Sequence, residues 1–486
     1  MVKLSDILFG VSIKSVIGDI KSVIVKKIEF DSRKVGDADL FIAINGTNFD
    51  GHSFIDSAIS SGAKSVIVEK IPDKINKDIC YVQVGCSSFS MSVLASNYYD
   101  NPSSKIKLVG VTGTNGKTTI VTLLHQLFSD LGYPTGLLST IENKIGTRSL
   151  KSTHTTGDAL QINKLLSEMV LAGCEYCFME VSSHAIHQNR ISSLIFDGGV
   201  FTNITHEHLD YHKDFKEYIS VKKRFFTNLN RSAFALTNKD DKNGNIMITN
   251  TKAKRITYSL KNMADYKCKV LESRIDGMLL NIQNHEIWVK IIGEFNAYNL
   301  LAVYSTSIEL GLEKNQILKG ISVLNPAQGR FYTVRNIENI TGIIDYMHTP
   351  DAYKNVLSTI NSIRNNTEKL IMVFGCGGDR DSEKRPKMTA IACNMSDQVI
   401  ITADNPRTEN IQEIISHMTE KLDPVQKKKV LIITDRSEAI KTACRLATSG
   451  DIILLAGKGH EKYQEIEGVK HYFDDVEELI ESLNIN

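Results

Sequence analysis

The chain lacks an excess of charge of either sign and lacks any long apolar run. Its 486 residues carry 57 basic and 56 acidic side chains, which gives a formal net charge of +1. So small a net charge recruits neither nucleic acid nor an anionic membrane surface. No apolar run approaches the roughly 18–20 residues of a membrane span. The N-terminus, MVKLSDILFG, also lacks the apolar core and cleavage site of a signal peptide. We therefore expect a cytoplasmic protein with no membrane span and no nucleic-acid partner.

A disulfide framework is also missing. The eight cysteines are scattered and mostly lie inside apolar segments, which is typical of reduced thiols in a cytosolic protein. Cys174 and Cys177 have the C-x-x-C spacing of a redox or zinc pair, but no second pair has that spacing. We interpret both as structural.

The length of the chain indicates several domains, because single domains rarely exceed about 250 residues. The segment NPSSK at 101–105 combines an Asn-Pro turn signal with serines and is a plausible boundary. Short apolar strands alternate with turn signals before it, and strand, turn and helix alternate after it. We predict an α/β fold with three domains at residues 1–104, 105–330 and 331–486.

Apolar runs of strand length end in small or polar residues throughout the last two predicted domains. This pattern is typical of parallel strands whose carboxyl ends carry a site. The runs are 107–113, 176–183, 197–204 and 232–241 in the central domain, and 341–347, 369–375, 397–404, 429–435 and 451–457 in the C-terminal domain. A helix is predicted over 293–311, with Leu300, Leu301, Tyr304 and Ile308 on one face.

One turn, VTGTNGKTT at 111–119, has most features of a phosphate-binding loop. A strict G-x-x-x-x-G-K-[ST] pattern misses it, because the position five before Gly116 is Val111 and the glycines stand at 110, 113 and 116. Phosphate binding needs backbone N–H groups that converge, which glycine permits, and the N-terminus of a helix. Lys117 adds a full charge, and Thr118 adds a hydroxyl suited to Mg²⁺. The alternative is a glycine-rich turn with a solvent-exposed lysine.

Two further segments contain candidate metal ligands. Glu180 ends a predicted strand and could hold Mg²⁺ opposite the phosphate loop; the alternative is a strand-end acid in solvent. The segment 202–212 has three histidines within seven residues, which would suit zinc. We favour magnesium there, because no cysteine lies near and the phosphate loop already implies it.

The segment TGTNGKTT at 112–119 resembles the ATP loop of the Mur ligase family, which also includes folylpolyglutamate synthases. The resemblance covers nearly the whole chain, with the motifs in the same order. It implies an enzyme that couples ATP cleavage to amide bond formation, with ATP and Mg²⁺ as cofactors.

The resemblance also implies roles for individual residues. ATP would contact Gly113, Thr114, Asn115, Gly116, Lys117, Thr118, Thr119, Asn296, Asn299, Arg330 and Asp345, with the asparagines toward adenine, the arginine at the phosphates and the aspartate at the ribose. Metal binding would involve Thr118, Glu180, His208 and Lys222, the last carbamylated. Carbamylation turns a cation into a carboxylate that can bind or orient a metal. The implied catalytic residues are Lys117, Glu180, His208 and Lys222.

The N-terminal segment FDSRKVGDADLFIAINGTNFDGHSFI resembles the uridine-nucleotide domain of the family. The implied contacts with the UDP-linked substrate are Ser32, Thr47, Asn48, Thr155, Thr156, Ser182, Gln188 and Arg190. Two positions depart from the pattern: His154 replaces the usual asparagine, and Met347 stands where alanine is usual. Met347 is tolerable if it faces the core.

Three loops of the C-terminal domain, at 375–381, 404–410 and 456–464, each follow a predicted strand and should line one edge of the sheet. Arginine at 380 and 407 suits bidentate capture of a carboxylate, and the acids at 404 and 461 suit an ammonium group. Without the resemblance, ordinary surface turns are an equal alternative.

Within the family, DNPR at 404–407 is the hallmark of the ligase that adds meso-2,6-diaminopimelate, whose far end carries a carboxylate that lysine lacks. The implied acceptor-binding residues are Arg380, Asp404, Asn405, Pro406, Arg407, Gly457 and Glu461. The implied reaction joins diaminopimelate to the D-glutamate side-chain carboxylate of UDP-MurNAc-L-Ala-D-Glu through an acyl phosphate. We expect a monomer.

Three alternatives remain at this point. A lysine-adding ligase would share the fold and differ at Arg407. A folylpolyglutamate synthase would lack the D-S-R domain. A nucleotide-binding scaffold without ligase activity would have no use for a second metal site.

Overall fold

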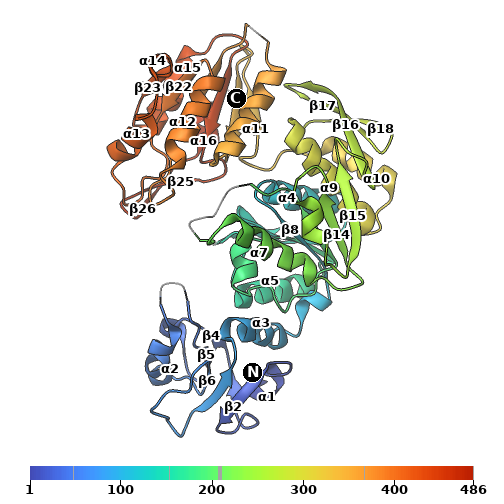
Figure 1. Ribbon diagram of the computed structural model, residues 1–486, viewed down its shortest axis with the longest axis vertical. Helices are drawn as coiled ribbons and strands as arrows, with labels where there is room; N and C mark the ends of the chain where they lie inside the picture. Colours follow the sequence, from blue (N-terminus) through green and yellow to red (C-terminus); the bar gives the residue numbers. More distant parts are fainter. Residues whose placement is uncertain (47–48, 153, 206–210, 366, 485–486) are drawn as a thin grey trace.

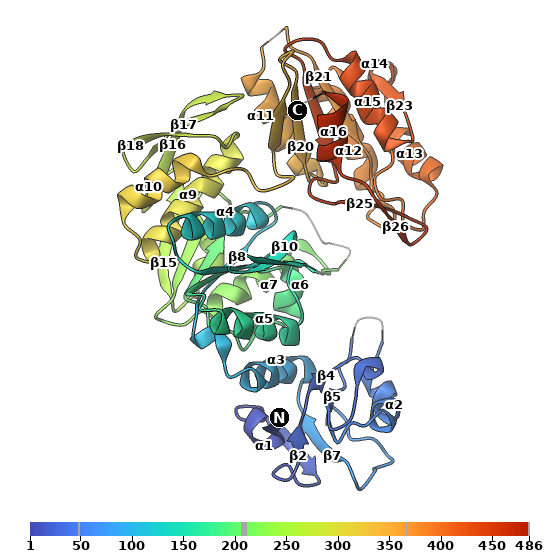
Figure 2. The same cartoon turned by 180° about the vertical axis from the view of Figure 1, so that it is seen from behind.

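The computed structural model describes residues 1–46, 49–152, 154–205, 211–365 and 367–484. Three α/β regions follow one another along its long axis, from the N-terminus at one end to the C-terminal region at the other (Figures 1 and 2). The predicted α/β fold class is confirmed. Thr47, Asn48 and His208, which we predicted as site residues, lie outside the described residues.

The N-terminal region contains a five-stranded sheet in the order β2-β7-β6-β5-β4. Four of its strands are parallel, and β2 pairs antiparallel with β7 at one edge. Its elements are β1 (Val2–Lys3), α1 (Leu4–Ile7), β2 (Ile13–Ile17), β3 (Ile24–Val25), β4 (Ile28–Glu29), η1 (Ser32–Lys34), β5 (Leu40–Ile42), η2 (Gly51–Phe54), α2 (Ile55–Ser60), β6 (Ser65–Val68), β7 (Cys80–Val84), α3 (Ser87–Tyr98) and η3 (Pro102–Ser104).

The central region contains an eleven-stranded sheet in the order β11-β10-β9-β12-β8-β13-β14-β15-β16-β17-β18. The strands from β9 to β16 in this order are parallel, and the four predicted runs form β8, β12, β13 and β14. Antiparallel hairpins extend both edges, and we did not predict them.

The bounds of the central elements are β8 (Lys107–Thr112), α4 (Lys117–Asp130), β9 (Thr135–Leu138), β10 (Glu142–Ile145), β11 (Arg148–Lys151), α5 (Ala159–Leu171), β12 (Tyr176–Glu180), α6 (Ser183–His187), β13 (Gly198–Phe201), α7 (Phe215–Thr227), β14 (Phe234–Asn238), α8 (Gly244–Ile248), β15 (Lys254–Ser259), β16 (Tyr266–Arg274), β17 (Gly277–Ile282), β18 (His285–Val289), α9 (Glu294–Glu309) and α10 (Lys314–Val323).

Two apolar cores cover the faces of the central sheet. Neighbouring strand residues point to opposite faces, so Phe178 packs with α4 and α9, whereas Cys177 and Met179 pack with α5 and α7. These helix pairs lie on opposite sides of the sheet in Figure 1. The strands β8, β12, β13 and β14 are buried on both faces, which explains why the four predicted runs are continuously apolar instead of alternating.

The C-terminal region contains a six-stranded sheet in the order β19-β20-β24-β21-β22-β23, in which only β19 is antiparallel among the described strands. The five predicted runs form the five parallel strands. Met347, the departure noted above, is buried in the core of this region.

The C-terminal elements are β19 (Tyr332–Arg335), β20 (Thr341–Asp345), α11 (Pro350–Ile363), β21 (Leu370–Phe374), α12 (Lys384–Met395), β22 (Gln398–Ile401), α13 (Ile411–Thr419), α14 (Pro424–Lys428), β23 (Val430–Ile432), α15 (Arg436–Leu446), β24 (Ile452–Ala456), β25 (Tyr463–Ile466), β26 (Val469–Tyr472) and α16 (Asp475–Ser482). Across the described part of the chain, no helix is both long and apolar enough to cross a membrane.

Candidate active site

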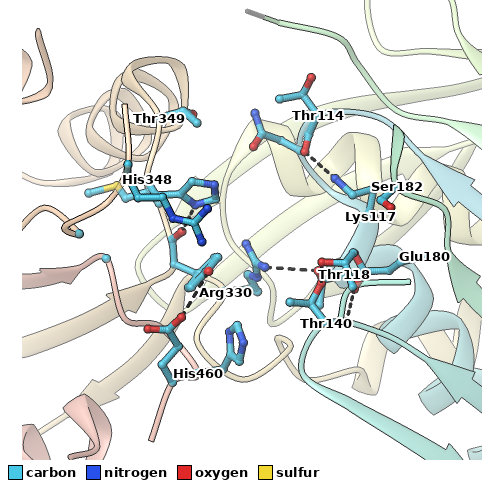
Figure 3. A pocket seen from close by; sticks show the side chains of 18 of the residues that line it. Thr114, Lys117, Thr118, Thr140, Glu180, Ser182, Arg330, His348, Thr349 and His460 are labelled. Atoms are coloured by element: carbon cyan, nitrogen blue, oxygen red, sulfur yellow. Dashed lines mark hydrogen bonds between the residues drawn. The ribbon is translucent and has the colours of Figure 1, made fainter. Parts of the chain in front are cut away.

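A large cleft of about 2860 Å³ separates the central and C-terminal sheets. The carboxyl ends of β8 and β12 open onto one wall, and those of β20, β21, β22 and β24 open onto the other. In Figure 3, Lys117, Thr118 and Glu180 lie on the first wall, and His348 and Thr349 face them from the second. Parallel strands collect a site at their carboxyl ends, so the two sheets contribute their site-bearing edges to one space.

The turn between β8 and α4 has the backbone of an anion site. Gly113 and Gly116 have φ of +154° and +89°. A Cβ at Gly113 would lie 1.9 Å from Thr202 Oγ1, and one at Gly116 would lie 2.6 Å from Asn299 Oδ1, so both positions require glycine. Val111, at the position of the absent first glycine, is buried within β8. The turn therefore begins two residues later than in the strict pattern.

The loop is held from behind by the end of β13. Thr114 N donates to Asn203 O at 2.8 Å, and Asn115 N donates to Asn203 Oδ1 at 2.9 Å. Thr202 Oγ1 donates to Asn115 O at 2.6 Å. These bonds fix the loop before any ligand binds, which lowers the entropic cost of phosphate binding.

Lys117 and Thr118 occupy the first turn of α4. Lys117 Nζ donates to Gly113 O at 2.9 Å and to Thr114 O at 2.8 Å, so its ammonium group stays at the mouth of the loop. Thr118 Oγ1 accepts a hydrogen bond from Arg330 Nη2 at 3.3 Å, drawn as a dashed line in Figure 3. Arg330 thus reaches from the start of the C-terminal region to the phosphate loop.

Glu180 ends β12 beside the loop, in register with Val111 of β8. Its side chain is 1% exposed, and Oε1 accepts a hydrogen bond from Thr140 N at 2.8 Å. Oε2 is buried and has no hydrogen-bond partner among the described residues. An orphaned buried carboxylate oxygen requires a cation or a donor. The residues therefore fit a hard divalent cation held between this carboxylate and the Thr118 hydroxyl.

Lys222 lies on α7 behind the same loop. Its side chain is 1% exposed, and Nζ donates to Gly113 O at 3.0 Å and lies 4.9 Å from the centre of the Tyr218 ring. The amine therefore reaches the phosphate loop and lines the cleft. Within the described residues, no group of three His, Cys, Asp or Glu side chains is arranged to hold a metal.

The predicted substrate residues on the central wall form one network. Thr156 Oγ1 donates to Glu180 O at 2.7 Å and accepts from Ser182 N at 3.1 Å. Arg190 Nη1 donates to Thr156 O at 2.8 Å, and its Nε donates to Gln188 Oε1 at 3.0 Å. Burial lowers the pKa of Arg190. The network connects these residues directly to the Glu180 site.

Loops 375–380 and 404–407 pack backbone against backbone on the other wall. A Cβ at Gly378 would lie 1.9 Å from Pro406 O. Arg407 has a left-handed backbone with φ of +52°, and its Nη1 donates to Gly378 O at 2.5 Å while Nε lies 3.8 Å from Glu465 Oε2. The guanidinium is therefore oriented by its neighbours, and Arg407 and Arg380 both line the cleft.

A buried polar network supports the acids of this wall. Asn405 Nδ2 donates to Glu461 Oε2 at 2.7 Å, and Asn405 Oδ1 accepts from Lys458 Nζ at 3.1 Å. Lys458 Nζ also lies 3.5 Å from Asp404 Oδ1. Burial lowers the pKa of Lys458, and burial together with the charge of Asp404 raises the pKa of Glu461. The wall is therefore a compact, partly desolvated set of opposite charges.

A fully buried ion pair holds the strands beneath this network. Arg436 donates to Asp475 through Nε at 2.7 Å and through Nη2 at 2.6 Å. The same guanidinium donates to Ala456 O at 3.2 Å and to Ala403 O at 3.5 Å. Those two carbonyls immediately precede Gly457 and Asp404, so the pair fixes the points where two of the cleft loops begin.

The cleft includes most of the predicted residues but not all of them. The predicted residues that line it are Thr114, Asn115, Gly116, Lys117, Thr118, Thr119, Thr155, Thr156, Glu180, Ser182, Arg190, Lys222, Arg330, Arg380, Asp404, Asn405, Arg407, Gly457 and Glu461. The described lining residues begin at Thr114, so Ser32 in the N-terminal region lies elsewhere.

Several predicted residues lie behind the lining. Asn299 Nδ2 donates to Asn296 Oδ1 at 2.9 Å beneath Gly116. Asp345 is buried and accepts a hydrogen bond from Phe331 N at 2.7 Å, and burial raises its pKa to about 6. Gly113, Gln188 and Pro406 are the other described residues of the central and C-terminal regions that we predicted and that do not line the cleft.

The lining and supporting residues that were not predicted include Lys458, Tyr346 and His460. All three lie in the segments 341–347 and 456–464 named above. Lys458 lies between the predicted Gly457 and Glu461, and Tyr346 follows Asp345. Sequence reasoning passed over them because their partners lie on other loops.

Comparison with known protein families matches three segments of the chain. These are the Mur ligase family, catalytic domain, at residues 24–95, the Mur ligase middle domain at 111–306, and the Mur ligase, glutamate ligase domain, at 329–459.

Curated relatives match along the whole chain. It is 53% identical to the UDP-N-acetylmuramoyl-L-alanyl-D-glutamate–2,6-diaminopimelate ligase of Cytophaga hutchinsonii, over 99% of both chains. It is 48% identical to the protein of that name from Bacteroides fragilis, again over 99% of both chains.

Solved structures agree with this comparison. A structure under the same ligase name has a TM-score of 0.71 and 32% identity, over 99% of each chain. The MurF ligase of Thermotoga maritima in complex with ADP has a TM-score of 0.62 and 17% identity, covering 95% of this chain and 98% of that one, which shows a common fold.

Proposed function

The chain belongs to the Mur ligase family, and on this premise we propose that it joins meso-2,6-diaminopimelate to the D-glutamate side-chain carboxylate of UDP-MurNAc-L-Ala-D-Glu with cleavage of ATP to ADP. The observation that carries this proposal is the cleft, in which the phosphate loop faces a wall of two arginines and two acids. The reaction belongs to peptidoglycan precursor synthesis. We propose that the enzyme acts as a monomer in the cytoplasm.

We assign the three substrates to three domains, at residues 1–104, 105–330 and 331–486. The N-terminal domain would bind the uridine nucleotide through Ser32, Thr47 and Asn48. Thr155, Thr156, Ser182, Gln188 and Arg190 would bind the peptide end. Ser32 does not line the cleft, so substrate binding requires the domains to approach one another.

ATP phosphates bind at the loop 113–119, where backbone N–H groups and the helix N-terminus favour anions. Lys117 offsets charge on the transferring phosphoryl group, and Arg330 contacts the same phosphates. Asn296 and Asn299 would lie on the adenine side, and Asp345 near the ribose.

Magnesium would be held by Thr118, Glu180 and His208, with Lys222 carbamylated. When bound, it supplies positive charge that stabilises phosphoryl transfer. The orphaned Oε2 of Glu180 supports this assignment. Carbamylation of Lys222 would replace an ammonium group with an anion at the back of the loop.

The chemistry has two steps. The D-glutamate carboxylate attacks the γ-phosphorus of ATP, which forms an acyl phosphate and releases ADP. The amine of diaminopimelate then attacks the acyl carbon, and the tetrahedral intermediate collapses with loss of inorganic phosphate and a proton. The chain's main contribution is to hold the three reactants in line.

The acceptor wall selects the amino acid. Arg407 and Arg380 bind the distal carboxylate, and Asp404 and Glu461 bind the ammonium group. Asn405, Pro406 and Gly457 shape the pocket. L-lysine has no distal carboxylate, so Arg407 would make no charge-assisted pair with it.

The test measures ADP release with UDP-MurNAc-L-Ala-D-Glu, ATP and Mg²⁺, with meso-diaminopimelate or L-lysine as acceptor. We expect turnover with diaminopimelate alone. In Arg407→Ala, the KM for diaminopimelate should rise about 10–100-fold, because a charge-assisted pair is lost, while the KM for ATP changes little. Turnover with lysine alone would keep the family and refute this role of Arg407; turnover with neither would refute the ligase.

A further inference from the structure

Tyr346 stands between the two walls of the cleft and contacts a functional side chain on each side. Its hydroxyl donates to Glu461 Oε1 at 3.4 Å, on the acceptor wall. Its ring faces the guanidinium of Arg330, whose Cζ lies 4.7 Å from the ring centre. Burial and the charge of Glu461 raise the pKa of Tyr346, so the phenol remains a neutral donor.

The backbone fixes Tyr346 relative to both segments. Tyr346 N donates to Gly329 O at 2.9 Å, next to Arg330. A Cβ at Gly459 would lie 2.6 Å from the Cβ of Tyr346. The His460 ring packs at 4.8 Å from the Tyr346 ring, centre to centre. Because Tyr346 packs against both Gly459 and His460, a movement of the 457–461 loop must be felt at Tyr346.

Arg330 continues the connection to the phosphate loop. Its Nη2 donates to Thr118 Oγ1 at 3.3 Å, and Figure 3 shows its side chain lying between the two walls. Its Nε is buried and makes no hydrogen bond within the described part of the chain. The Tyr346 ring and Thr118 therefore help to orient the guanidinium.

We propose that Tyr346 is a positioning residue that couples the acceptor site at Glu461 to the nucleotide site at Arg330 and Thr118. Its hydroxyl orients the carboxylate that receives the diaminopimelate ammonium group, and its ring orients the arginine that contacts the ATP phosphates. Occupation of either site therefore favours the geometry that the other needs. The proposal rests on the proposed function for the identity of the two ligands.

Two variants separate the two contacts. Tyr346→Phe removes the hydroxyl and keeps the ring, and Tyr346→Leu removes both. Tyr332→Phe is the matched control, because this half-buried tyrosine lies in β19 of the same region and does not line the cleft. We would measure the KM for meso-diaminopimelate by ADP release, and the affinity for a non-hydrolysable ATP analogue by calorimetry.

We expect Tyr346→Phe to raise the KM for diaminopimelate about 3–10-fold, as for loss of one hydrogen bond, with analogue affinity within about twofold of wild type. Tyr346→Leu should also weaken analogue binding about 3–10-fold, because the cation–π contact is lost. The wild-type KM for ATP should fall as diaminopimelate rises, and this dependence should disappear in Tyr346→Leu.

An unchanged KM for diaminopimelate in Tyr346→Phe would overturn the proposal, and so would unchanged analogue affinity in Tyr346→Leu. Equal changes in the Tyr332→Phe control would reduce Tyr346 to a structural role and overturn it too. Failure of the proposed function looks different: the wild type itself would release no ADP, while calorimetry would still report the contact between Tyr346 and Arg330.

Discussion

The two walls of the cleft are built by different physical means. The nucleotide wall is centred on one contiguous segment, 113–119, whose backbone is fixed by hydrogen bonds to Asn203 and whose glycines admit no Cβ. The acceptor wall uses side chains from three separate loops, held by a buried polar network around Asn405 and Lys458. The difference teaches that a phosphate site can be built locally, whereas a site for a zwitterion must be assembled from charges on several strands.

The largest effect should come from the ion pair beneath the acceptor wall. Arg436→Met leaves Asp475 charged and buried, and removal of one partner of such a pair costs about 3–5 kcal/mol. We expect a lower melting temperature and a higher KM for diaminopimelate. The double variant Arg436→Met/Asp475→Leu should recover most of the stability. If the single variant melts like wild type, the acceptor wall does not depend on this pair.

In the nucleotide wall, by contrast, a substitution should reduce activity and leave stability almost unchanged. Lys117→Met removes the charge at the phosphate loop and breaks the hydrogen bonds to Gly113 O and Thr114 O. We expect kcat to fall about 10²–10³-fold, as for loss of one electrostatic donor in an active site. The melting temperature should change little. Lys107→Met, at the exposed start of β8, is the control, and equal loss in both would contradict the role of Lys117.

The smallest effect should be on the pH dependence of stability, through His125 in α4, the helix that follows the phosphate loop. Burial in α4 lowers the pKa of His125 to about 4, with a further contribution from Lys144. The folded state thus disfavours the charged form, so the free energy of unfolding should fall as pH drops from about 6.5 toward 4. His125→Leu should lessen this loss by about 1–2 kcal/mol at pH 5.

Urea unfolding at pH 5 and pH 7.5 measures this effect, and the exposed His285→Leu is the control. A similar pH dependence of the free energy of unfolding in wild type and His125→Leu would show that His125 does not cause the loss of stability at low pH.

The acceptor wall illustrates the limits of prediction from sequence. Arg407 and Asp404 were predicted because they stand in one short motif after one strand. Lys458 was not, although it is buried beside Asp404, because its partners Asn405 and Tyr463 O come from different loops. Nothing local to position 458 distinguishes a buried network lysine from a solvent-exposed one.

The same limit appears in the central sheet. Buried parallel strands were predicted from their apolar runs, but the antiparallel extension β16–β18 was not. Side chains such as Glu272 and Trp288 are exposed there, because this extension covers only part of the core. Single-sided burial leaves a weaker signal than burial on both faces.

The sequence by itself determined the α/β class, the strands that carry the site, and the phosphate loop, because each depends on neighbouring residues and on burial that leaves a local pattern. Only the tertiary structure decided that Glu180 Oε2 lacks a partner among the described residues, that Ser32 lies away from the cleft, and that Tyr346 joins Glu461 to Arg330. Those facts depend on how separate strands and domains come together, and contacts between distant segments leave no periodic trace in a single chain.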